Sequence, residues 1–202
     1  MLTQNDKRTF GETFSRYGYV MTTAQLTAEK LFYRDIQHML DEGLIERVRW
    51  GYYHWINDHG ASEVIFINRL FPDAVLCMET ALFYYGYSRR TPAQWNIAID
   101  INVSRQRFKI DYPAIRAYRV KPELLLLGET KGQIDLEDVR IYVRDRTICD
   151  VLRNMNRMDR EIFHSAIQGY VKDQKKNIPN LIECAKVLRV QKRMKDLIGV
   201  WL

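Results

Sequence analysis

The sequence has few of the features that mark secreted, membrane or metal-binding proteins. Its three cysteines, Cys77, Cys149 and Cys184, are far apart in apolar stretches and form no Cys-x-x-Cys or Cys/His cluster. Since disulfide frameworks and zinc sites need spaced sets of ligands, this pattern favours buried free thiols in a reducing compartment. No apolar run approaches the roughly 20 residues of a membrane span, and the N-terminus is unlike a signal peptide. We therefore expect a cytoplasmic protein without membrane, metal or cofactor.

The motifs of common enzymes are absent as well. The chain has no P-loop, no His-Glu-x-x-His and no Gly-Ser followed by paired aspartates, which a nucleotidyltransferase would need. Its four histidines are scattered. A metal for nuclease chemistry would have to use acidic residues that lack ligand-like spacing with a histidine or lysine, namely Asp100, Asp135, Glu137 and Asp138. We expect a binding protein rather than an enzyme.

The strongest local signals lie between residues 18 and 55. Thr22 and Gln25 have the spacing of a capping box, in which each side chain bonds the backbone N–H of the other, so a short helix is expected from about Thr23. A second helix is predicted by apolar residues at helical spacing and a glycine suited to a left-handed C-cap: Phe32, Ile36, Met39, Leu40 and Gly43. Two short helices with a tight connection form the helix-turn-helix arrangement, whose second helix can enter the DNA major groove.

The stretch LIERVRWGYYHW that follows predicts a β-hairpin. It has strand-favouring residues on both sides of Trp50, and Gly51 can supply the positive φ of a tight turn. Arg47 and Arg49 are expected to project near this turn, where arginines suit phosphate or minor-groove contact. A helix-turn-helix followed by a basic hairpin is a winged helix. We therefore expect residues 1–60 to form a winged helix-turn-helix DNA-binding domain.

The polar residues left on the predicted second helix are candidates for base readout. Arginine and glutamine can make bidentate contacts to guanine and adenine edges, respectively. The candidate DNA-binding residues are Thr23, Tyr33, Arg34, Gln37, His38, Arg47, Arg49 and Trp50. The alternative interpretation is an ordinary solvated helix face. Charge does not decide between the two, since residues 1–60 carry seven Lys/Arg against eight Asp/Glu.

Residues 61–202 are expected to form a second, mixed α/β domain, which makes the chain α+β. Their pattern predicts a helix over 72–87, strands over 95–103, 107–112 and 115–120, and a turn and strand over 132–145. Three helices are expected to follow. The first opens with a capping box of Thr147 and Asp150, the second is capped by Asp159, and the third starts at Pro179.

The net charge of +6 is concentrated near the C-terminus. Residues 169–195 carry eight Lys/Arg against two Asp/Glu. A possible polyanion-binding or toxin-related surface comprises Lys172, Lys175, Lys176, Lys186, Arg189 and Arg193. On one helix opened by Pro179, the last three of these would share a face. The alternative is a solvated cationic face that keeps the protein soluble.

Three stretches follow one another in a characteristic order. The hairpin GLIERVRWGYY contains Gly43, Ile45, Arg47, Val48, Gly51 and Tyr53; FPDAVLCMETALFYYGY is followed by TP; and VRIYVRDRTICDVLR is followed by NLIECAKVLRV. In order and spacing, these stretches resemble the AbiEi antitoxins of bacterial abortive-infection, type IV toxin–antitoxin systems. The resemblance covers about residues 18–190.

The resemblance implies a winged-helix domain that represses the antitoxin's own operon, at operator DNA with inverted repeats in its promoter. It also implies a C-terminal domain that counters a nucleotidyltransferase-like toxin encoded beside it, either by direct contact or through a shared target. The sequence departs from the family at Phe32, where a Ser, Thr or Asn cap often starts the recognition helix, so either Tyr33 or Arg34 leads into the groove. The alternative is a stand-alone winged-helix regulator with a ligand- or partner-sensing C-terminal domain.

Overall fold

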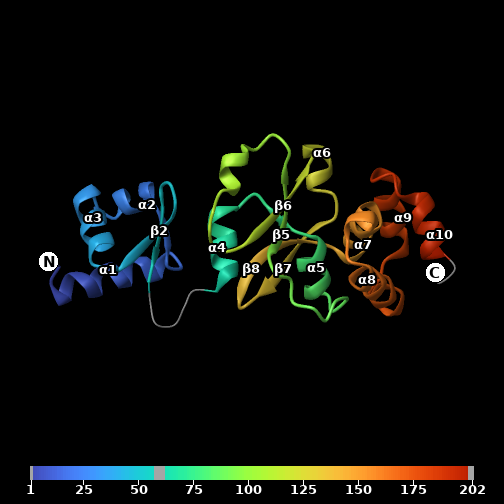
Figure 1. The fold of residues 1–202 in the computed structure, drawn as a ribbon, viewed down its shortest axis with the longest axis horizontal. Helices are drawn as coiled ribbons and strands as arrows, with labels where there is room; N and C mark the ends of the chain where they lie inside the picture. Colours follow the sequence, from blue (N-terminus) through green and yellow to red (C-terminus); the bar gives the residue numbers. More distant parts are fainter. Residues whose placement is uncertain (1, 57–61, 200–202) are drawn as a thin grey trace. The chain divides into compact units, whose positions relative to one another are not determined.

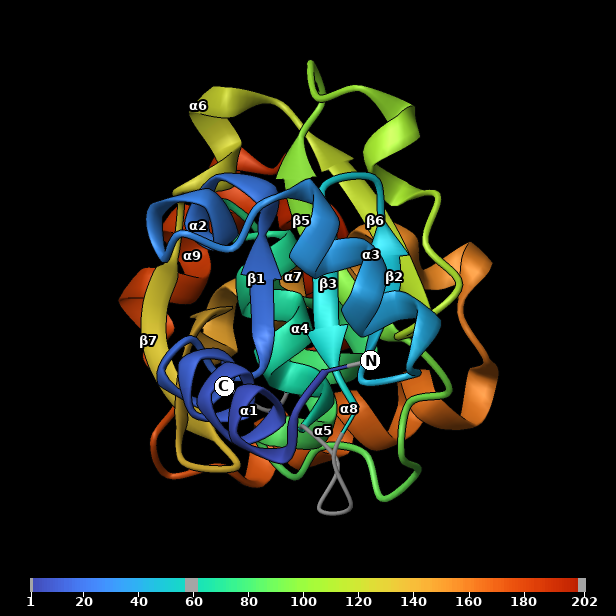
Figure 2. The ribbon, with the colours of Figure 1, turned by 90° about the vertical axis from the view of Figure 1, so that its left-hand side faces the viewer.

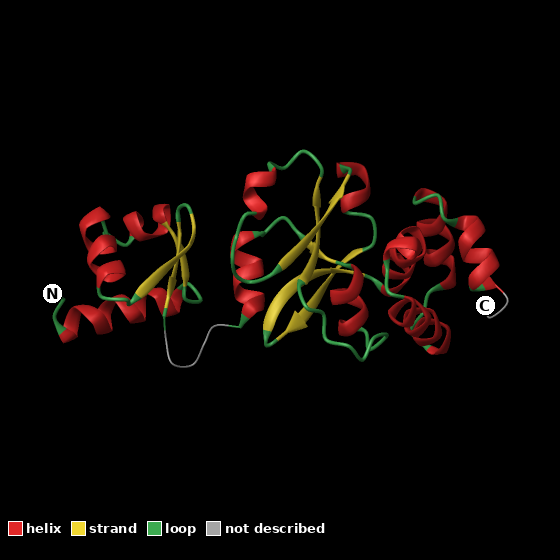
Figure 3. Cartoon of the chain, viewed as in Figure 1, coloured by secondary structure: helices red, strands yellow, loops and turns green. Residues whose placement is uncertain are grey.

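The computed structural model describes residues 2–56 and 62–199 and divides the chain into two compact units. The N-terminal unit comprises residues 1–72 and 106–113, and the C-terminal unit comprises residues 73–105 and 114–202. This division differs from the expected boundary after residue 60, because the segments 62–72 and 106–113 pack with the N-terminal unit. Both units contain helices and strands, so the predicted α+β class is confirmed (Figure 1; Figure 3).

The N-terminal unit combines a small antiparallel sheet with helices. Its elements are α1 (Gln4–Arg16), β1 (Val20–Thr22), α2 (Thr23–Ala28), α3 (Tyr33–Asp41), β2 (Ile45–Arg49), β3 (Tyr52–Trp55) and α4 (Glu63–Leu70). The strands lie side by side in the order β1-β3-β2, as Figure 2 shows. The predicted pair of short helices and the hairpin after it are therefore present.

The starts of α2 and α3 are fixed by side chains that bond backbone N–H groups. The predicted capping box is confirmed: the Gln25 N–H donates to the Thr22 hydroxyl at 3.2 Å, and the Thr22 N–H donates to the Gln25 side chain at 2.8 Å. At α3, the N–H of Phe32 donates to the Asp35 carboxylate at 2.9 Å. Gly43 follows α3 with φ +65°, the left-handed conformation expected of it.

The apolar face of α3 is narrower than predicted. Ile36 and Met39 are buried and Leu40 is partly buried, but the side chain of Phe32 is 57% exposed. Phe32 is the N-cap residue, with extended φ and ψ, so its side chain does not continue the stripe of the helix. The prediction that Phe32 belongs to the apolar face of this helix was therefore wrong.

The sheet of the N-terminal unit is covered on both faces. Along β3, Tyr53 points into a core that also contains Phe14, Met21, Leu26, Ile36 and Met39. The next residue, His54, points to the opposite face, where its ring lies 4.7 Å from that of Phe66 on α4. Because α4 covers this face, it belongs to the N-terminal unit.

The predicted strand over 107–112 is not formed. This segment contains the end of a short 3-10 helix, η1 (Arg105–Phe108), and a loop. Its aromatic residues pack instead on the N-terminal unit: Phe108 stacks on Phe71 at 6.1 Å between ring centroids, and Tyr112 meets Phe66 edge-on at 5.5 Å. These contacts replace the hydrogen-bond ladder that a strand would need.

The sheet of the C-terminal unit has the order β6-β5-β4-β8-β7. Its strands are β4 (Val75–Leu76), β5 (Trp95–Asp100), β6 (Ile115–Val120), β7 (Glu129–Ile134) and β8 (Glu137–Tyr142). β5 runs parallel to β6 and β4 parallel to β8, whereas β4–β5 and β7–β8 are antiparallel. The structure confirms the predicted strands over 95–103 and 115–120 and the turn before residue 137. The first of these strands is shorter than predicted and ends at Asp100.

The predicted helix over 72–87 is split into two elements. Val75 and Leu76 form β4 and pair with β5, and α5 (Met78–Tyr84) begins only afterwards. The chain turns sharply between them, because Met78 has φ +46°. Gly86, at φ +73°, follows the helix close to the predicted end.

The remaining helices build the core of the C-terminal unit. They are α6 (Pro122–Leu125), α7 (Arg144–Asn154), the 3-10 helix η2 (Met155–Arg157), α8 (Arg160–Lys172), α9 (Ile178–Val187) and α10 (Gln191–Leu197). The predicted apolar stripes of α7, α8 and α9 meet in one cluster, which includes Ile148, Val151, Leu152, Ala166, Tyr170, Leu181 and Ala185. From α7 onward the described chain is helical (Figure 3).

The predicted capping box at the start of α7 was wrong. The helix begins at Arg144, one turn earlier than expected, so Thr147 lies inside it. The Thr147 hydroxyl donates to the carbonyl of Val143 at 3.0 Å, and Asp150 pairs with Arg146 instead of a backbone N–H. The predicted cap of α8 is confirmed, since the Asp159 carboxylate accepts from the N–H groups of Glu161 and Ile162.

Candidate functional site

The exposed face of α3 carries the residues predicted to read bases. Tyr33 is 77% exposed, Arg34 and His38 are also exposed, and Gln37 is partly exposed. All of these residues lie on one short helix whose opposite side is anchored by Ile36 and Met39. Helix α3 packs beside β2.

The tip of the β2–β3 hairpin carries an arginine and an exposed aromatic ring. The turn is made at Trp50 and Gly51, which has φ +76°, and Trp50 is 87% exposed. The guanidinium of Arg47 lies 5.5 Å from the ring centroid of Trp50 and 5.6 Å from that of Tyr53. Arg47 therefore keeps its charge at the surface while the rings limit its motion.

Arg49 does not project in the same way, contrary to the prediction. A bulge at Val48 shifts the register, so Arg47 lies opposite Tyr53 and Arg49 lies opposite Tyr52. Neighbouring residues of β3 face opposite sides of the sheet, and the two arginines follow them. The guanidinium of Arg49 stacks 4.0 Å from the Tyr52 ring centroid and lies 5.8 Å from that of Phe71. The bulge thus removes Arg49 from the surface that Arg47 occupies.

Thr23 connects the start of α2 to the hairpin turn. Its backbone N–H donates to the carbonyl of Gly51 at 2.9 Å, and its side chain is exposed. The structure therefore brings together two of the predicted DNA-binding residues, Thr23 and Trp50.

His54 lies under the hairpin and was not predicted from the sequence. Its Nδ1 is 2.9 Å from the Glu46 carboxylate, and its Nε2 is buried without a hydrogen-bond partner in the described part of the chain. The ring packs on Phe66. Its role here is to join β2, β3 and α4.

A cavity of about 880 Å³ in the C-terminal unit is lined by many basic side chains. Its wall comes from the edge strand β6, the segment before α6, α7 with η2, and the end of α9. Seven of its lining residues are Lys or Arg, and two, Glu123 and Asp150, are acidic. The volume is within the roughly 300–1,000 Å³ typical of small-molecule sites. This cavity was not predicted, because its arginines come from segments far apart along the chain.

A buried ion pair on α7 lines this cavity. Arg146 is 1% exposed, and its Nε donates to Oδ2 of Asp150 at 3.0 Å. Its Nη1 also donates to the carbonyls of Leu124 at 2.7 Å and Leu127 at 2.8 Å. Burial raises the pKa of Asp150, and the neighbouring Arg146 opposes that rise. Arg146 therefore holds the α6 segment on α7, and its charge is compensated.

Other lining arginines are exposed. Arg116, Arg153, Arg157 and Arg189 have no ion-pair partner in the described part of the chain. By contrast, Arg119 donates to the carbonyls of Ile101 and Val103, and Lys121 lies 3.8 Å from Glu123. The cavity lining thus includes four exposed arginines outside the Arg146–Asp150 pair, of which Arg153 also lowers the pKa of Asp150 and Arg116 lies against the Tyr118 ring.

Three of the six residues of the predicted polyanion surface, Lys186, Arg189 and Arg193, do not share a helix face. α9 ends at Val187, Arg189 takes φ +58°, and Arg193 lies on the separate helix α10. The Nη1 of Arg193 donates to the carbonyls of Leu152 and Arg153, at the end of α7. The prediction that these three residues lie on one helix face was therefore wrong, because the chain turns between α9 and α10. Of the six, Arg189 is the one that lines the cavity.

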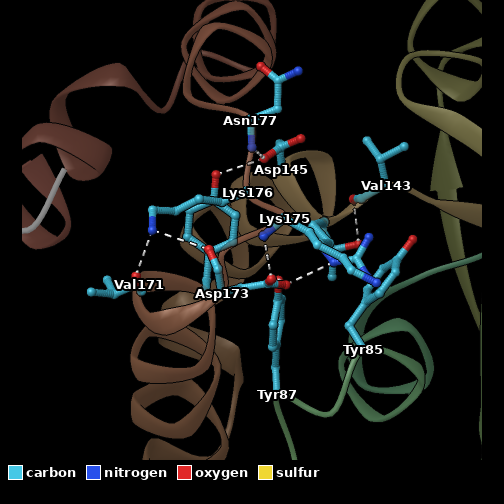
Figure 4. A network of polar contacts seen from close by, with 12 residues as sticks. Tyr85, Tyr87, Val143, Asp145, Val171, Asp173, Lys175, Lys176 and Asn177 are labelled. Carbon is cyan, nitrogen blue, oxygen red and sulfur yellow. Dashed lines mark hydrogen bonds and ion pairs between the residues drawn. The ribbon is translucent and has the colours of Figure 1, made fainter.

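Two more of these residues, Lys175 and Lys176, belong to a structural network after α8 (Figure 4). The ammonium of Lys176 donates to the carbonyls of Val171 and Asp173, where the helix ends. The Asp173 carboxylate accepts from the Lys175 backbone N–H at 2.7 Å, from Arg144 at 2.9 Å, and from the hydroxyl of Tyr87. Lys172 is exposed at the end of α8.

The cysteines and acidic residues show no further site. Cys77, Cys149 and Cys184 are buried free thiols, as expected, and burial raises the pKa of each, that of Cys184 to about 11. Across residues 2–56 and 62–199, no group of three or more His, Cys, Asp and Glu side chains is arranged to hold a metal ion. Within the same residues, no helix is both long enough and apolar enough to span a bilayer.

Comparison with known proteins finds few relatives. No protein family matches the sequence, and no curated protein matches it. Among solved structures, the chain is similar to the RV2827C protein from Mycobacterium tuberculosis, with 12% sequence identity and a TM-score of 0.49, over 93% of this chain and 81% of that one. A likeness of this degree carries no conclusion about function.

Proposed function

We propose that the chain is a DNA-binding transcriptional repressor whose N-terminal unit is a winged helix. The observations that support this proposal are the exposed polar face of α3, a helix that packs beside β2, and a hairpin that carries Arg47 and the exposed Trp50. Helix α3 follows a short helix and a tight connection, and a helix in that position can enter the major groove. In this arrangement Arg34 and Gln37 contact base edges, and Arg47 contacts the DNA backbone.

The proposal is tested by gel shifts with the promoter DNA that lies upstream of the gene. A triple variant, Arg34→Ala, Gln37→Ala and Arg47→Ala, is expected to lose the preference for promoter over unrelated DNA. The matched control is Arg8→Ala, since Arg8 is an exposed arginine of the same unit that pairs with Glu12 on α1. Equal binding by the parent and the triple variant would refute the assignment.

The second part of the proposal is the antitoxin role that the AbiEi resemblance implies. The C-terminal unit then counters a nucleotidyltransferase-like toxin encoded beside this gene, and the chain itself catalyses no reaction.

The antitoxin role is tested by rescue of cells that express the toxin. The triple variant of the whole chain suits this test better than a fragment starting at residue 62, because α4 packs on the N-terminal sheet and a cut before it would expose Phe66. Cells that express the toxin should be rescued by the triple variant as well as by the parent. Loss of rescue would show that neutralisation depends on DNA binding.

A second candidate function is a stand-alone regulator whose C-terminal unit senses a ligand. The observation that favours it is the basic cavity, which has the size of a ligand site. The two candidates differ in their genetic setting, because the antitoxin needs a toxin gene beside it. Absence of such a gene, together with promoter binding, would favour the stand-alone regulator.

A further inference from the structure

The basic cavity of the C-terminal unit places uncompensated charges close together. One space of about 880 Å³ is lined by four exposed arginines that form no ion pair within the described chain, namely Arg116, Arg153, Arg157 and Arg189. Like charges that converge on a hollow repel one another, and a bound anion relieves this repulsion. Both acidic residues of the lining are already compensated by neighbours, Asp150 by Arg146 and Glu123 by Lys121. The net charge offered to a ligand is therefore strongly positive.

The chemistry of these groups favours phosphate among anions. A guanidinium presents a planar set of N–H donors that matches two oxygens of a phosphate or carboxylate at once. Several arginines around one space suit a ligand with more than one anionic group. A compact phosphorylated end of a small molecule satisfies both conditions.

Another part of the cavity wall is apolar. Tyr118 is a partly buried aromatic residue of β6 and pairs with the buried Ala98 of β5, whereas the neighbouring Ala117 faces the other side of the sheet. The Arg116 guanidinium lies 5.4 Å from the Tyr118 ring centroid. Burial raises the pKa of Tyr118 to about 12, so its hydroxyl stays neutral and can donate a hydrogen bond at physiological pH. The wall therefore offers a surface for an uncharged, flat part of a ligand beside the arginines.

The backbone is strained at two places around the cavity. Met78 and Arg189 both line it, and both have positive φ, at 46° and 58°, although neither is a glycine. Such conformations cost free energy and persist where the surroundings impose them, often at binding sites. At Arg189 the conformation belongs to the end of α9, where the Val190 N–H donates to the carbonyl of Ala185 at 2.9 Å.

We propose that this cavity binds a small phosphorylated molecule of nucleotide size. Its phosphate groups contact Arg153, Arg157 and Arg189, and its uncharged body lies against Tyr118. This site lies in the C-terminal unit and does not depend on whether the N-terminal unit binds DNA.

The experiment is isothermal titration calorimetry of the full-length protein with defined probes. These are nucleoside triphosphates with each of the common bases, the matching nucleosides, pyrophosphate, citrate, and a short single-stranded oligonucleotide. Nucleotides are expected to bind with a stoichiometry near one, pyrophosphate more weakly, and nucleosides and citrate at least about tenfold more weakly than the best nucleotide. Binding of citrate as tight as that of nucleotides would overturn the phosphate assignment.

The variants test whether binding occurs in the cavity. The double variant Arg153→Ala and Arg157→Ala is expected to weaken nucleotide binding at least about tenfold, without loss of helical circular dichroism. The matched control, Arg160→Ala and Lys175→Ala, removes two exposed cations of the same unit that do not line the cavity. A control that loses as much affinity as the double variant would refute the site, as would failure of every nucleotide to bind. Binding of the oligonucleotide alone would replace the proposed small ligand by a nucleic-acid strand.

Discussion

The two units of the molecule present their positive charges in opposite ways. In the N-terminal unit, Arg34 and Arg47 stand singly on an exposed helix and an exposed turn, within a segment that has more acids than bases. In the C-terminal unit, Arg153, Arg157 and Arg189 gather around one cavity. Single exposed cations suit a long polyanion that supplies phosphates at intervals, whereas converging cations suit a compact anion. The number of charges in a segment therefore says less about its partner than their placement does.

A second contrast separates arginines that hold the fold from arginines that are free to bind. Arg49 and Arg146 are committed to contacts inside their own units, the first on Tyr52 and the second on Asp150. Arg47 and Arg153 lie close to them in sequence, yet both are exposed. Each arginine that is held inside its unit thus has an exposed neighbour, and substitution of that neighbour serves as a matched control.

The largest effect is expected for Arg146→Met. This change leaves the buried Asp150 carboxylate without its partner and frees the carbonyls of Leu124 and Leu127. Removal of one partner of a buried ion pair costs about 3–5 kcal/mol. Urea denaturation followed by circular dichroism should show a loss of unfolding free energy of that order.

Two control variants sharpen this result. Arg153→Ala, on the same helix but exposed, should change the unfolding free energy by no more than about 0.5 kcal/mol. The double variant Arg146→Met and Asp150→Leu removes both charges and should recover part of the loss, because the isolated buried carboxylate is gone. Equal stability of Arg146→Met and the parent would show that the pair is not buried in solution.

The next effect concerns base readout by α3. Arg34→Ala or Gln37→Ala should each cost ~1–3 kcal/mol of operator affinity and relax the base preference at one position. Competition gel shifts with single-base operator variants measure both quantities. A uniform loss across all sequences would instead assign these side chains to the phosphate backbone.

Local signals in the sequence predicted the N-terminal unit well. The Thr22–Gln25 capping box, the left-handed Gly43 and the turn at Gly51 each depend on a few adjacent residues, and each is present in the structure. The bulge at Val48 was not predicted, because nothing in the residues themselves sets the register between β2 and β3. That single extra residue decides which of Arg47 and Arg49 is exposed.

The C-terminal unit was less accessible to prediction because its features are formed by distant segments. β4 is two residues long and exists only because it pairs with β5 and β8, so the sequence around Leu76 was assigned to a helix. The cavity joins Arg116 on β6 to Arg157 after α7 and Arg189 after α9. No periodicity connects these three positions. The composition predicted an excess of positive charge near the C-terminus. The structure shows that Lys176 and Arg193 use theirs in hydrogen bonds to backbone carbonyls.

A smaller effect separates Arg47 from Arg49. Arg47→Ala should weaken binding to all DNA sequences and lower the slope of affinity against salt by about one phosphate contact. Arg49→Ala should leave that slope unchanged and destabilise the N-terminal unit by about 1 kcal/mol, because its stacking on Tyr52 is lost. Gel shifts at several salt concentrations and thermal denaturation measure the two outcomes. The same salt dependence and the same stability for both variants would mean that the bulge does not place the two arginines on different surfaces.

The smallest effect is expected at the Asp173 network of the C-terminal unit. Burial alone would raise the pKa of Asp173, but hydrogen bonds from Tyr87 and the Lys175 backbone, together with Arg144, lower it below the ordinary value of 3.8. The ionised carboxylate therefore stabilises the folded state fully above pH 3.8, and this contribution is lost as the pH falls through the lowered pKa. Asp173→Asn should reduce the unfolding free energy at neutral pH by only about 0.5–1 kcal/mol, because the amide oxygen still accepts a hydrogen bond and the part that depends on the charge is lost.

The same change should flatten the acid limb of stability against pH. Urea denaturation of the parent and of Asp173→Asn across the acid range measures this, with the exposed Asp196→Asn as the control. The difference between the parent and Asp173→Asn should shrink as the pH falls below 3.8, because the parent then loses the charge that the variant lacks at every pH. A difference that stays constant across that range would mean that Asp173 acts through its shape and neutral hydrogen bonds. In that case the Lys175 backbone N–H and the Tyr87 hydroxyl would be held equally well by a neutral acceptor.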